Sequence, residues 1–285
     1  MTVTRQIPAT KITALVSDVD GTLVDDHKEL TPRAKAVVAQ LRASGILFSL
    51  ISSRPPRGLQ RLVATLDVTE PVAGFNGGVV VGPDFVPVAS YILSPETARL
   101  AVAMLSARQA QIWVFSGQDW LVRHNDQSYL ELERHTIGFP QTYVEQFGPA
   151  LDSAAKIVGV SENFELLEHY ERELRAALDG QATIARSQPY YLDITHPLAN
   201  KGVALSTIST LLGVPLAEIA VIGDGANDVA MFERSGLSIA MGNASPEVQR
   251  AADFVTGSNR NEGFAMAIER FVLDGVRSNI DTGAA

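Results

Sequence analysis

The chain has 285 residues, of which 46% are hydrophobic and 19% charged, with a formal net charge of −9. This size and composition predict about two globular domains with a sizeable core. The lack of cysteine excludes disulfides, thiol nucleophiles and cysteine-bound metal. The acidic balance argues against a nucleic-acid backbone or an anionic membrane as partner, and an anionic substrate would need local cations to bind it.

The composition along the chain also bears on location. The first residues carry no apolar stretch of the secretory type, and no run of about eighteen apolar residues occurs. We therefore expect a cytoplasmic protein without a membrane partner. The sequence leaves the oligomeric state open between a monomer and a homodimer.

The first predicted element is a buried strand over residues 12–17, followed directly by Asp18-Val19-Asp20-Gly21-Thr22. Alternate side chains of an extended backbone point the same way, so Asp18 and Asp20 are expected to face one pocket at the carboxyl end of the strand. Two carboxylates so close repel each other unless one is protonated or a cation lies between them. An EF-hand calcium loop is the alternative, but it needs a glycine where Leu23 stands and a helix where the strand lies.

Helix and strand then alternate. Thr31-Pro32 begins a helix that ends at Gly45, and a strand over 46–51 ends at Ser52. The Ser52 hydroxyl and the backbone N–H groups after it could hold an oxyanion, although a plain turn is common at such a position. A helix over 55–66 and a strand, turn and strand over 71–81 are expected next.

Between residues 83 and 189 the pattern changes to paired strands beside helices, which predicts an inserted α+β domain with an antiparallel sheet. The expected domains are therefore residues 1–82 with 190–285, and residues 83–189. The helices are expected near 95–108, 128–136 and 164–178, and the strands near 112–115, 120–124, 155–160, 183–186 and 190–195.

The last segment returns to alternation. It predicts helices over 201–212, 228–234 and 263–273, strands over 219–222 and 237–241, and a frayed tail over 274–285. Alternation on both sides of the insertion predicts an α/β fold, with a doubly wound, Rossmann-like parallel sheet as its core.

Two further polar sites fall in this segment. Lys201 opens a helix, where its charge opposes the helix dipole at a cost of roughly 0.3 to 1 kcal/mol that a nearby anion would offset. Gly223-Asp224-Gly225-Ala226-Asn227-Asp228 follows a strand, and a spacing of four lets Asp224 and Asp228 face one point. Four carboxylates at one sheet edge, without cysteine, favour a hard divalent cation such as Mg²⁺.

In this order, the Asp18 motif, Ser52, Lys201 and the Asp224 motif resemble the haloacid dehalogenase superfamily of aspartyl-phosphate phosphohydrolases. The inserted domain resembles its C2 cap. The segments that resemble the class IIB, Cof-type branch are Asn76-Gly77-Gly78, Asn200-Lys201-Gly202 and GDGANDVAMF. Ser53-Arg54 departs from the Gly-Arg usual in that branch, which leaves the serine role intact but alters the entrance.

The resemblance implies a role for each core motif. Asp18 would be the nucleophile, and Asp20 would be the general acid and base, which requires a higher pKa than that of Asp18. Ser52 and Lys201 would hold phosphoryl oxygens. Magnesium would be held by the Asp18 carboxylate, the Asp20 main-chain carbonyl and Asp224, with Asp228 acting through water or by orienting Lys201. The expected substrate-binding residues are Ser53, Arg54, Asn76, Gly77, Arg186 and Asn227.

These roles predict a magnesium-dependent phosphatase for small-metabolite phosphomonoesters, such as a sugar phosphate, a nucleotide or a cofactor phosphate. A phosphomutase would keep the phosphate on the substrate and is the first alternative. A non-catalytic phosphometabolite sensor is the second, but a sensor would have no need of Asp20. Specificity for the rest of the substrate is expected in the inserted domain, because the parallel domain uses its strand ends for phosphate and metal.

Overall fold

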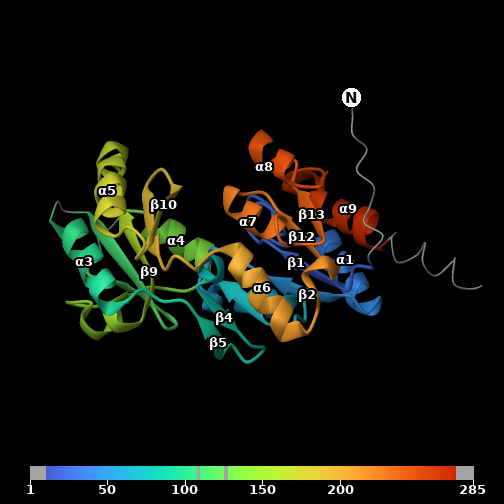
Figure 1. Ribbon diagram of the computed structural model, residues 1–285, viewed down its shortest axis with the longest axis horizontal. Helices are drawn as coiled ribbons and strands as arrows, with labels where there is room; N and C mark the ends of the chain where they lie inside the picture. Colours follow the sequence, from blue (N-terminus) through green and yellow to red (C-terminus); the bar gives the residue numbers. More distant parts are fainter. Residues whose placement is uncertain (1–10, 108–109, 125–127, 274–285) are drawn as a thin grey trace, which may run out of the picture.

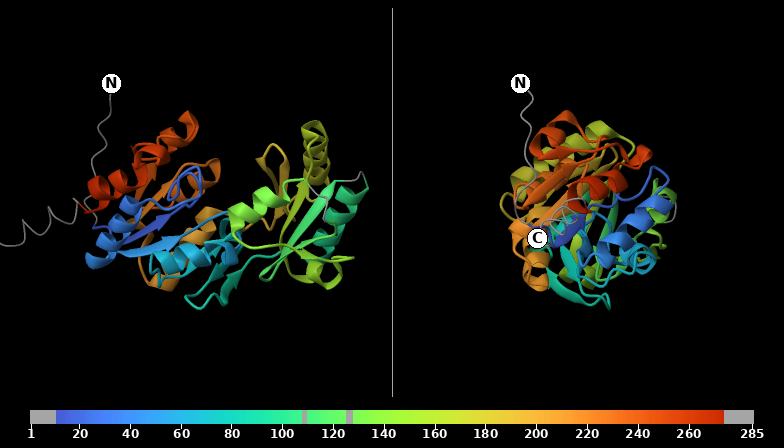
Figure 2. Two further views of the ribbon diagram at one scale, coloured as in Figure 1. Left: turned by 180° about the vertical axis from the view of Figure 1, so that it is seen from behind. Right: turned by 90° about the vertical axis from the view of Figure 1, so that its right-hand side faces the viewer.

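The computed structural model describes residues 11–107, 110–124 and 128–273, which form two lobes (Figure 1). Each lobe is built around its own main sheet, and the same division is visible from behind (Figure 2). The tail predicted over residues 274–285 lies outside the described residues. None of the helices within the described ranges is long and apolar enough to cross a membrane.

A parallel sheet of five strands forms the centre of the first lobe. Its strand order is β14-β13-β12-β1-β2, and every pairing in it is parallel. The carboxyl ends of these strands therefore open on one edge of the sheet. The strands are β1 (Ala14–Ser17), β2 (Leu47–Leu50), β12 (Ile219–Gly223), β13 (Leu237–Ala240) and β14 (Phe254–Val255).

Helices cover both faces of this sheet, which confirms the predicted doubly wound fold. Because successive strand residues point to opposite faces, Leu15 packs in the core under α1 (Pro32–Ala43) and α9 (Gly263–Ala267), and Val16 packs in another core. The second core lies under α6 (Lys201–Leu212), α7 (Val229–Phe232) and α8 (Pro246–Ala251). The predicted closing helix changes at residue 268 to a π-helical turn, η7 (Ile268–Leu273).

A small antiparallel sheet joins the edge of the parallel one. It contains β3 (Val72–Gly74), β4 (Val79–Val81) and β5 (Pro87–Ser90), and a single bridge links Ala73 to Ile51. The helix predicted over 55–66 is a 3₁₀ turn, η1 (Pro56–Leu59), followed by α2 (Gln60–Thr65). Further 3₁₀ turns are η2 (Phe75–Gly77), η3 (Gly148–Ser153), η4 (Leu216–Glu218), η5 (Ala226–Asp228) and η6 (Asn259–Asn261).

The second lobe is built on a six-stranded sheet of order β10-β11-β9-β6-β7-β8, antiparallel except for the β7–β8 pair. This confirms the predicted α+β unit. Its strands are β6 (Gln111–Ser116), β7 (Asp119–Val122), β8 (Thr142–Tyr143), β9 (Ala154–Val160), β10 (Thr183–Gln188) and β11 (Tyr191–Thr195). Its helices are α3 (Pro95–Ser106), α4 (Leu130–Ile137) and α5 (Phe164–Ala177).

The two faces of the six-stranded sheet differ. One face, with Val114 and Ile157, packs in a core with α3 and α5. The opposite face carries Trp113, Phe115 and Trp120, and the Phe115 ring lies 5.5 Å from the ring of Phe75 in the first lobe. We refer to this second face as the aromatic face; it is the one directed at the parallel domain.

The predicted domain boundaries need correction, because both fall inside hairpins. β5 lies beyond the expected boundary at residue 82, yet it pairs with β4; β11 lies beyond residue 189, yet it pairs with β9. We propose instead that the parallel domain comprises residues 11–91 and 196–273 and the inserted domain residues 92–195. At these new boundaries the rings of Tyr91 and His196 stack with centroids 5.9 Å apart.

Candidate active site

Lys201 lies between two carboxylates at the carboxyl edge of the parallel sheet. Its Nζ donates to Oδ1 of Asp18, after β1, and to Oδ1 of Asp228, after β12, each over 2.5 Å. The three residues are 1%, 5% and 0% exposed, respectively. The positive charge of Lys201 at the start of a helix is therefore offset by two carboxylates, those of Asp18 and Asp228. All three groups are shielded from water.

The loop after β12 carries Asp224 as well as Asp228. Asp228 Oδ2 accepts from the backbone N–H groups of Asp224 and Gly225, over 2.9 and 2.8 Å. The Asp224 carboxylate accepts from Thr22 Oγ1 over 3.2 Å and from Asn243 Nδ2 over 3.0 Å. These contacts fix the loop against the Asp18 motif.

The acidic cluster fits a divalent cation. Carboxylate oxygens of Asp18, Asp224 and Asp228 lie within 4.8 Å of one another, and all the donors are hard oxygens. Burial raises the pKa of Asp18 to about 8; Lys201 opposes the rise, and Asp228 adds to it. Burial and Asp228 also raise the pKa of Asp224. A cation of the Mg²⁺ type would relieve this repulsion.

Gly21 explains how closely these segments pack. Its φ is +83°, which favours glycine, and a Cβ at this position would lie 2.3 Å from Asp224 Oδ2. The turn after Asp20 therefore has room for a hydrogen only. A side chain at position 21 would displace the Asp224 carboxylate.

Asp20 lies in a different environment from Asp18. Arg54 donates to both of its oxygens, over 2.8 and 2.7 Å, and Lys28 Nζ lies 2.9 Å from Oδ1. Burial alone would raise the pKa of Asp20, but the hydrogen bonds and charges of Arg54 and Lys28 outweigh it and hold the pKa below its usual value. The expected order, with Asp20 above Asp18, is therefore wrong for this structure: two cations hold Asp20 ionised, while burial favours the neutral form of Asp18.

Ser52 and the two asparagines lie at neighbouring turns. Ser52 is fully buried after β2, and its Oγ accepts from the Arg54 backbone N–H over 3.1 Å. The Asn227 amide donates to Asn76 Oδ1 over 2.9 Å, which connects the loop after β12 to the turn after β3. The adjacent Gly77 has a φ of +101°, and a Cβ there would lie 2.6 Å from Ala204 Cβ in α6.

The remaining two predicted site residues differ in position. Ser53 is half-buried, between Ser52 and Arg54. Arg186 lies on the edge strand β10, where its guanidinium pairs with Glu168 and Glu171 of α5 over 3.2 and 3.3 Å. Its strand partner is Leu192, which belongs to the core beneath α3 and α5. Arg186 is thus on the opposite side of the sheet from the aromatic face.

Two site residues were missed by the sequence reasoning. Lys28 contacts Asp20 from the loop before α1, and Asn243 joins Asp224 to the Gly21 carbonyl, to which its Nδ2 donates over 2.9 Å. Asn243 follows the predicted strand over 237–241, so its position at the same sheet edge was a usable signal. No comparable signal marks Lys28, because its contact depends on the path of a turn.

Known proteins are similar to this chain in sequence and in fold. The family described as haloacid dehalogenase-like hydrolase matches residues 15–268. The putative phosphatase YxeH of Bacillus subtilis is 30% identical over 261 residues, covering 90% of this chain and 97% of that protein. A haloacid dehalogenase-like hydrolase from Bacteroides thetaiotaomicron has a TM-score of 0.84 at 28% identity, covering 91% of this chain and 99% of that one. A subclass IIB sugar phosphatase, at 20% identity, shares the fold with a TM-score of 0.78 over 91% of this chain and 98% of that one.

Proposed function

The chain belongs to the haloacid dehalogenase-like hydrolases, and on that premise we propose that it is a magnesium-dependent phosphatase that hydrolyses phosphomonoesters of small metabolites through an aspartyl-phosphate intermediate. The observation that carries this proposal is the buried Lys201, paired with Asp18 and Asp228 beside Asp224. Such a group of buried charges at the ligand-binding edge of the sheet is costly to keep without a function.

Asp18 is the proposed nucleophile. Within the part of the chain that the structure describes, Lys201 is the side chain that donates to its carboxylate, and it does so at Oδ1. Oδ2 is then the oxygen that forms the bond to phosphorus, while the bond from phosphorus to the leaving oxygen breaks. The charge of Lys201 stabilises the carboxylate form that this attack requires.

The acidic cluster would hold the metal through Asp18, Asp224 and Asp228, together with the main-chain carbonyl of Asp20. Bound magnesium would offset the negative charge of the carboxylates and of the phosphoryl oxygens.

Asp20 is the proposed acid and base. It gives a proton to the leaving oxygen, and it takes one from the water that then attacks the aspartyl phosphate. Arg54 and Lys28 hold it ionised in this structure, so it must become protonated as these cations turn to the substrate. Ser52 and Lys201 would hold the non-bridging oxygens, and the Asn76–Asn227 contact supports the turns around them.

Phosphate release tests the proposal. The full chain is incubated with magnesium and a panel of sugar phosphates, nucleotides and cofactor phosphates, and free phosphate is measured. Release from at least one compound is expected. Recovery of the phosphate at a new position on the substrate would indicate a phosphomutase, and binding without turnover would indicate a sensor; either result would contradict the proposal.

A further inference from the structure

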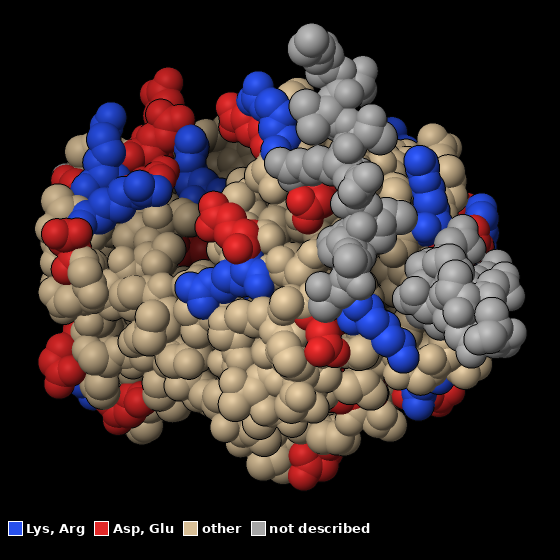
Figure 3. Space-filling view, turned by 45° about the vertical axis from the view of Figure 1, so that its right-hand side comes forward, with Lys and Arg blue, Asp and Glu red and all other residues tan. Residues whose placement is uncertain are grey.

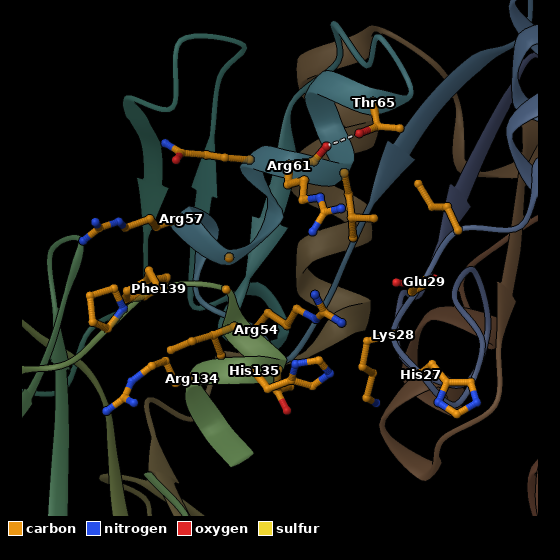
Figure 4. Close-up of a pocket in the computed structure, with 18 of the residues that line it drawn as sticks. His27, Lys28, Glu29, Arg54, Arg57, Arg61, Thr65, Arg134, His135 and Phe139 are labelled. Carbon is orange, nitrogen blue, oxygen red and sulfur yellow. Dashed lines mark hydrogen bonds between the residues drawn. The ribbon is translucent and has the colours of Figure 1, made fainter. Parts of the chain in front are cut away.

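A cavity of about 770 Å³ lies where the two lobes meet. It is lined by the segment before and into α1, by η1 and α2, and by the end of α4 with the turn after it (Figure 4). Ile137 contributes backbone atoms close to Gly58, so both lobes form the wall. A volume of this size suits part or all of a small metabolite.

The charge of this cavity is opposite to that of the protein. Six Lys or Arg residues and two His residues line it, against one acidic residue, Glu29. The whole chain has 23 Lys and Arg against 32 Asp and Glu. On the face shown in Figure 3, acidic and basic side chains stand beside one another, so the one-sided set in the cavity differs from that face. It supplies the local cations that an acidic protein needs for an anionic ligand.

The Lys and Arg side chains that Figure 4 labels fall into two groups. Arg57 stacks over the Phe139 ring at 4.5 Å, and Arg134 donates to Gln141; both side chains point away from the middle of the cavity (Figure 4). Lys28, Arg54 and Arg61 lie around that middle, beside the imidazole of His135.

The second group carries uncompensated charge. Lys28 and Arg54 share a single carboxylate, that of Asp20. Arg61 is exposed and makes no ion pair within the described residues. The cavity therefore offers more positive charge than its own acids neutralise.

From this we infer that the cavity binds a second anionic group of the substrate, a phosphate or a carboxylate on the leaving-group side. The inference rests on the proposed function, because it takes Asp20 as the group that protonates the leaving oxygen. Arg54 and Lys28 contact Asp20 and also line the cavity, so the cavity adjoins Asp20 through these two side chains, and the inference places the far end of the leaving group there. Arg61 would be a specificity-determining residue, and planar guanidinium groups suit both phosphate and carboxylate.

The test compares matched substrates in the full chain with magnesium. One pair is a hexose monophosphate and a hexose bisphosphate; the other is glycerol phosphate and phosphoglycerate. The wild type is expected to have the higher kcat/KM for the doubly anionic member of at least one pair, and the pair that shows it identifies phosphate or carboxylate.

The variants are Arg61→Gln and Arg61→Glu, with Arg172→Gln, an exposed arginine of α5, as control. A charge-assisted hydrogen bond changes binding by roughly tenfold to a hundredfold, so the ratio of kcat/KM between doubly and singly anionic substrates should fall by about tenfold in Arg61→Gln and further in Arg61→Glu. The control should leave the ratio unchanged.

A ratio that stays constant in both Arg61 variants, or a wild type that prefers the singly anionic member of both pairs, would overturn the inference. Neither result affects the proposed function, which requires only that some phosphomonoester is hydrolysed. If the wild type releases phosphate from none of these compounds nor from p-nitrophenyl phosphate, the proposed function itself fails.

Discussion

The guanidinium of Arg54 holds both carboxylate oxygens of Asp20, through Nε over 2.8 Å and Nη2 over 2.7 Å. A two-point contact of this kind fixes orientation as well as charge. Because Lys28 adds a second cation, Asp20 is kept in its ionised form, although the proposed acid role requires a proton.

Arg54→Gln is therefore expected to raise the pKa of Asp20, since it removes the largest of the influences that lower it. The protonated form of Asp20 would then persist to higher pH. In the pH profile of kcat for an alkyl phosphate, the alkaline limb should therefore shift to higher pH. Profiles of the wild type and of Arg172→Gln should coincide. An alkaline limb that stays in place in Arg54→Gln would separate Arg54 from the protonation of Asp20.

Asp20→Asn should affect substrates according to their leaving groups. An alkoxide needs a proton to depart, whereas nitrophenolate departs without one. The loss of kcat/KM on a sugar phosphate should exceed the loss on p-nitrophenyl phosphate by roughly 10² to 10⁴. Equal losses on both would point to a structural effect.

Asp18→Asn should abolish turnover and preserve the fold, because an amide oxygen cannot attack phosphorus as a carboxylate does. Circular dichroism checks the fold. In the wild type, rapid acid quenching during turnover should trap one phosphoryl group on the peptide that contains Asp18, as seen by mass spectrometry. A phosphoryl group on another peptide would move the nucleophile elsewhere.

Magnesium should be required for activity, and it should also stabilise the fold. A ligand at 100 times its Kd adds about 2.7 kcal/mol to the free energy of unfolding, so thermal unfolding with and without magnesium should differ. Asp224→Asn should lose most of this difference, while Asp179→Asn, an exposed residue after α5, should keep it. Full activity in the presence of a chelator would contradict the magnesium requirement.

The aromatic face should influence specificity more than the far side of the same sheet. Trp120→Phe is expected to change the ranking of substrates in a panel, because Trp120 lies on the face directed at the parallel domain and its buried Nε1 has no hydrogen-bond partner among the residues that the structure describes. Arg186→Gln should leave the ranking intact, since its guanidinium pairs with α5. A ranking that follows Arg186 and ignores Trp120 would reverse this assignment.

Much of the parallel domain could be predicted from the sequence, because its apolar runs are short, buried on both sides and followed by polar motifs. The helix over 201–212 and the strand before Asp224 agree with the structure within one residue. The boundaries between the two domains could not be predicted in this way, because Pro83 and Pro189 are typical of linkers and of hairpin turns alike. Only strand pairing distinguishes a linker from a hairpin turn.

Some features of the candidate site could likewise be predicted from the sequence, and others could not. That Asp18 and Asp228 meet follows from parallel strands ending at one edge. The contact of Lys201 with both does not follow from this rule, because Lys201 opens a helix that comes after a strand of the inserted domain. The relative pKa values of Asp18 and Asp20 do not follow, because they depend on where Arg54 and Lys28 place their charges. Those positions come from the path of two turns, for which the spacing of residues gives no information.

The stacked rings of Tyr91 and His196 couple the two connections between the domains. Two tethers that lay far apart and moved independently would let the inserted domain slide along the parallel domain. Tethers that are held side by side fix the place where the inserted domain is attached, so any movement of the aromatic face would be a rotation about that place and not a translation.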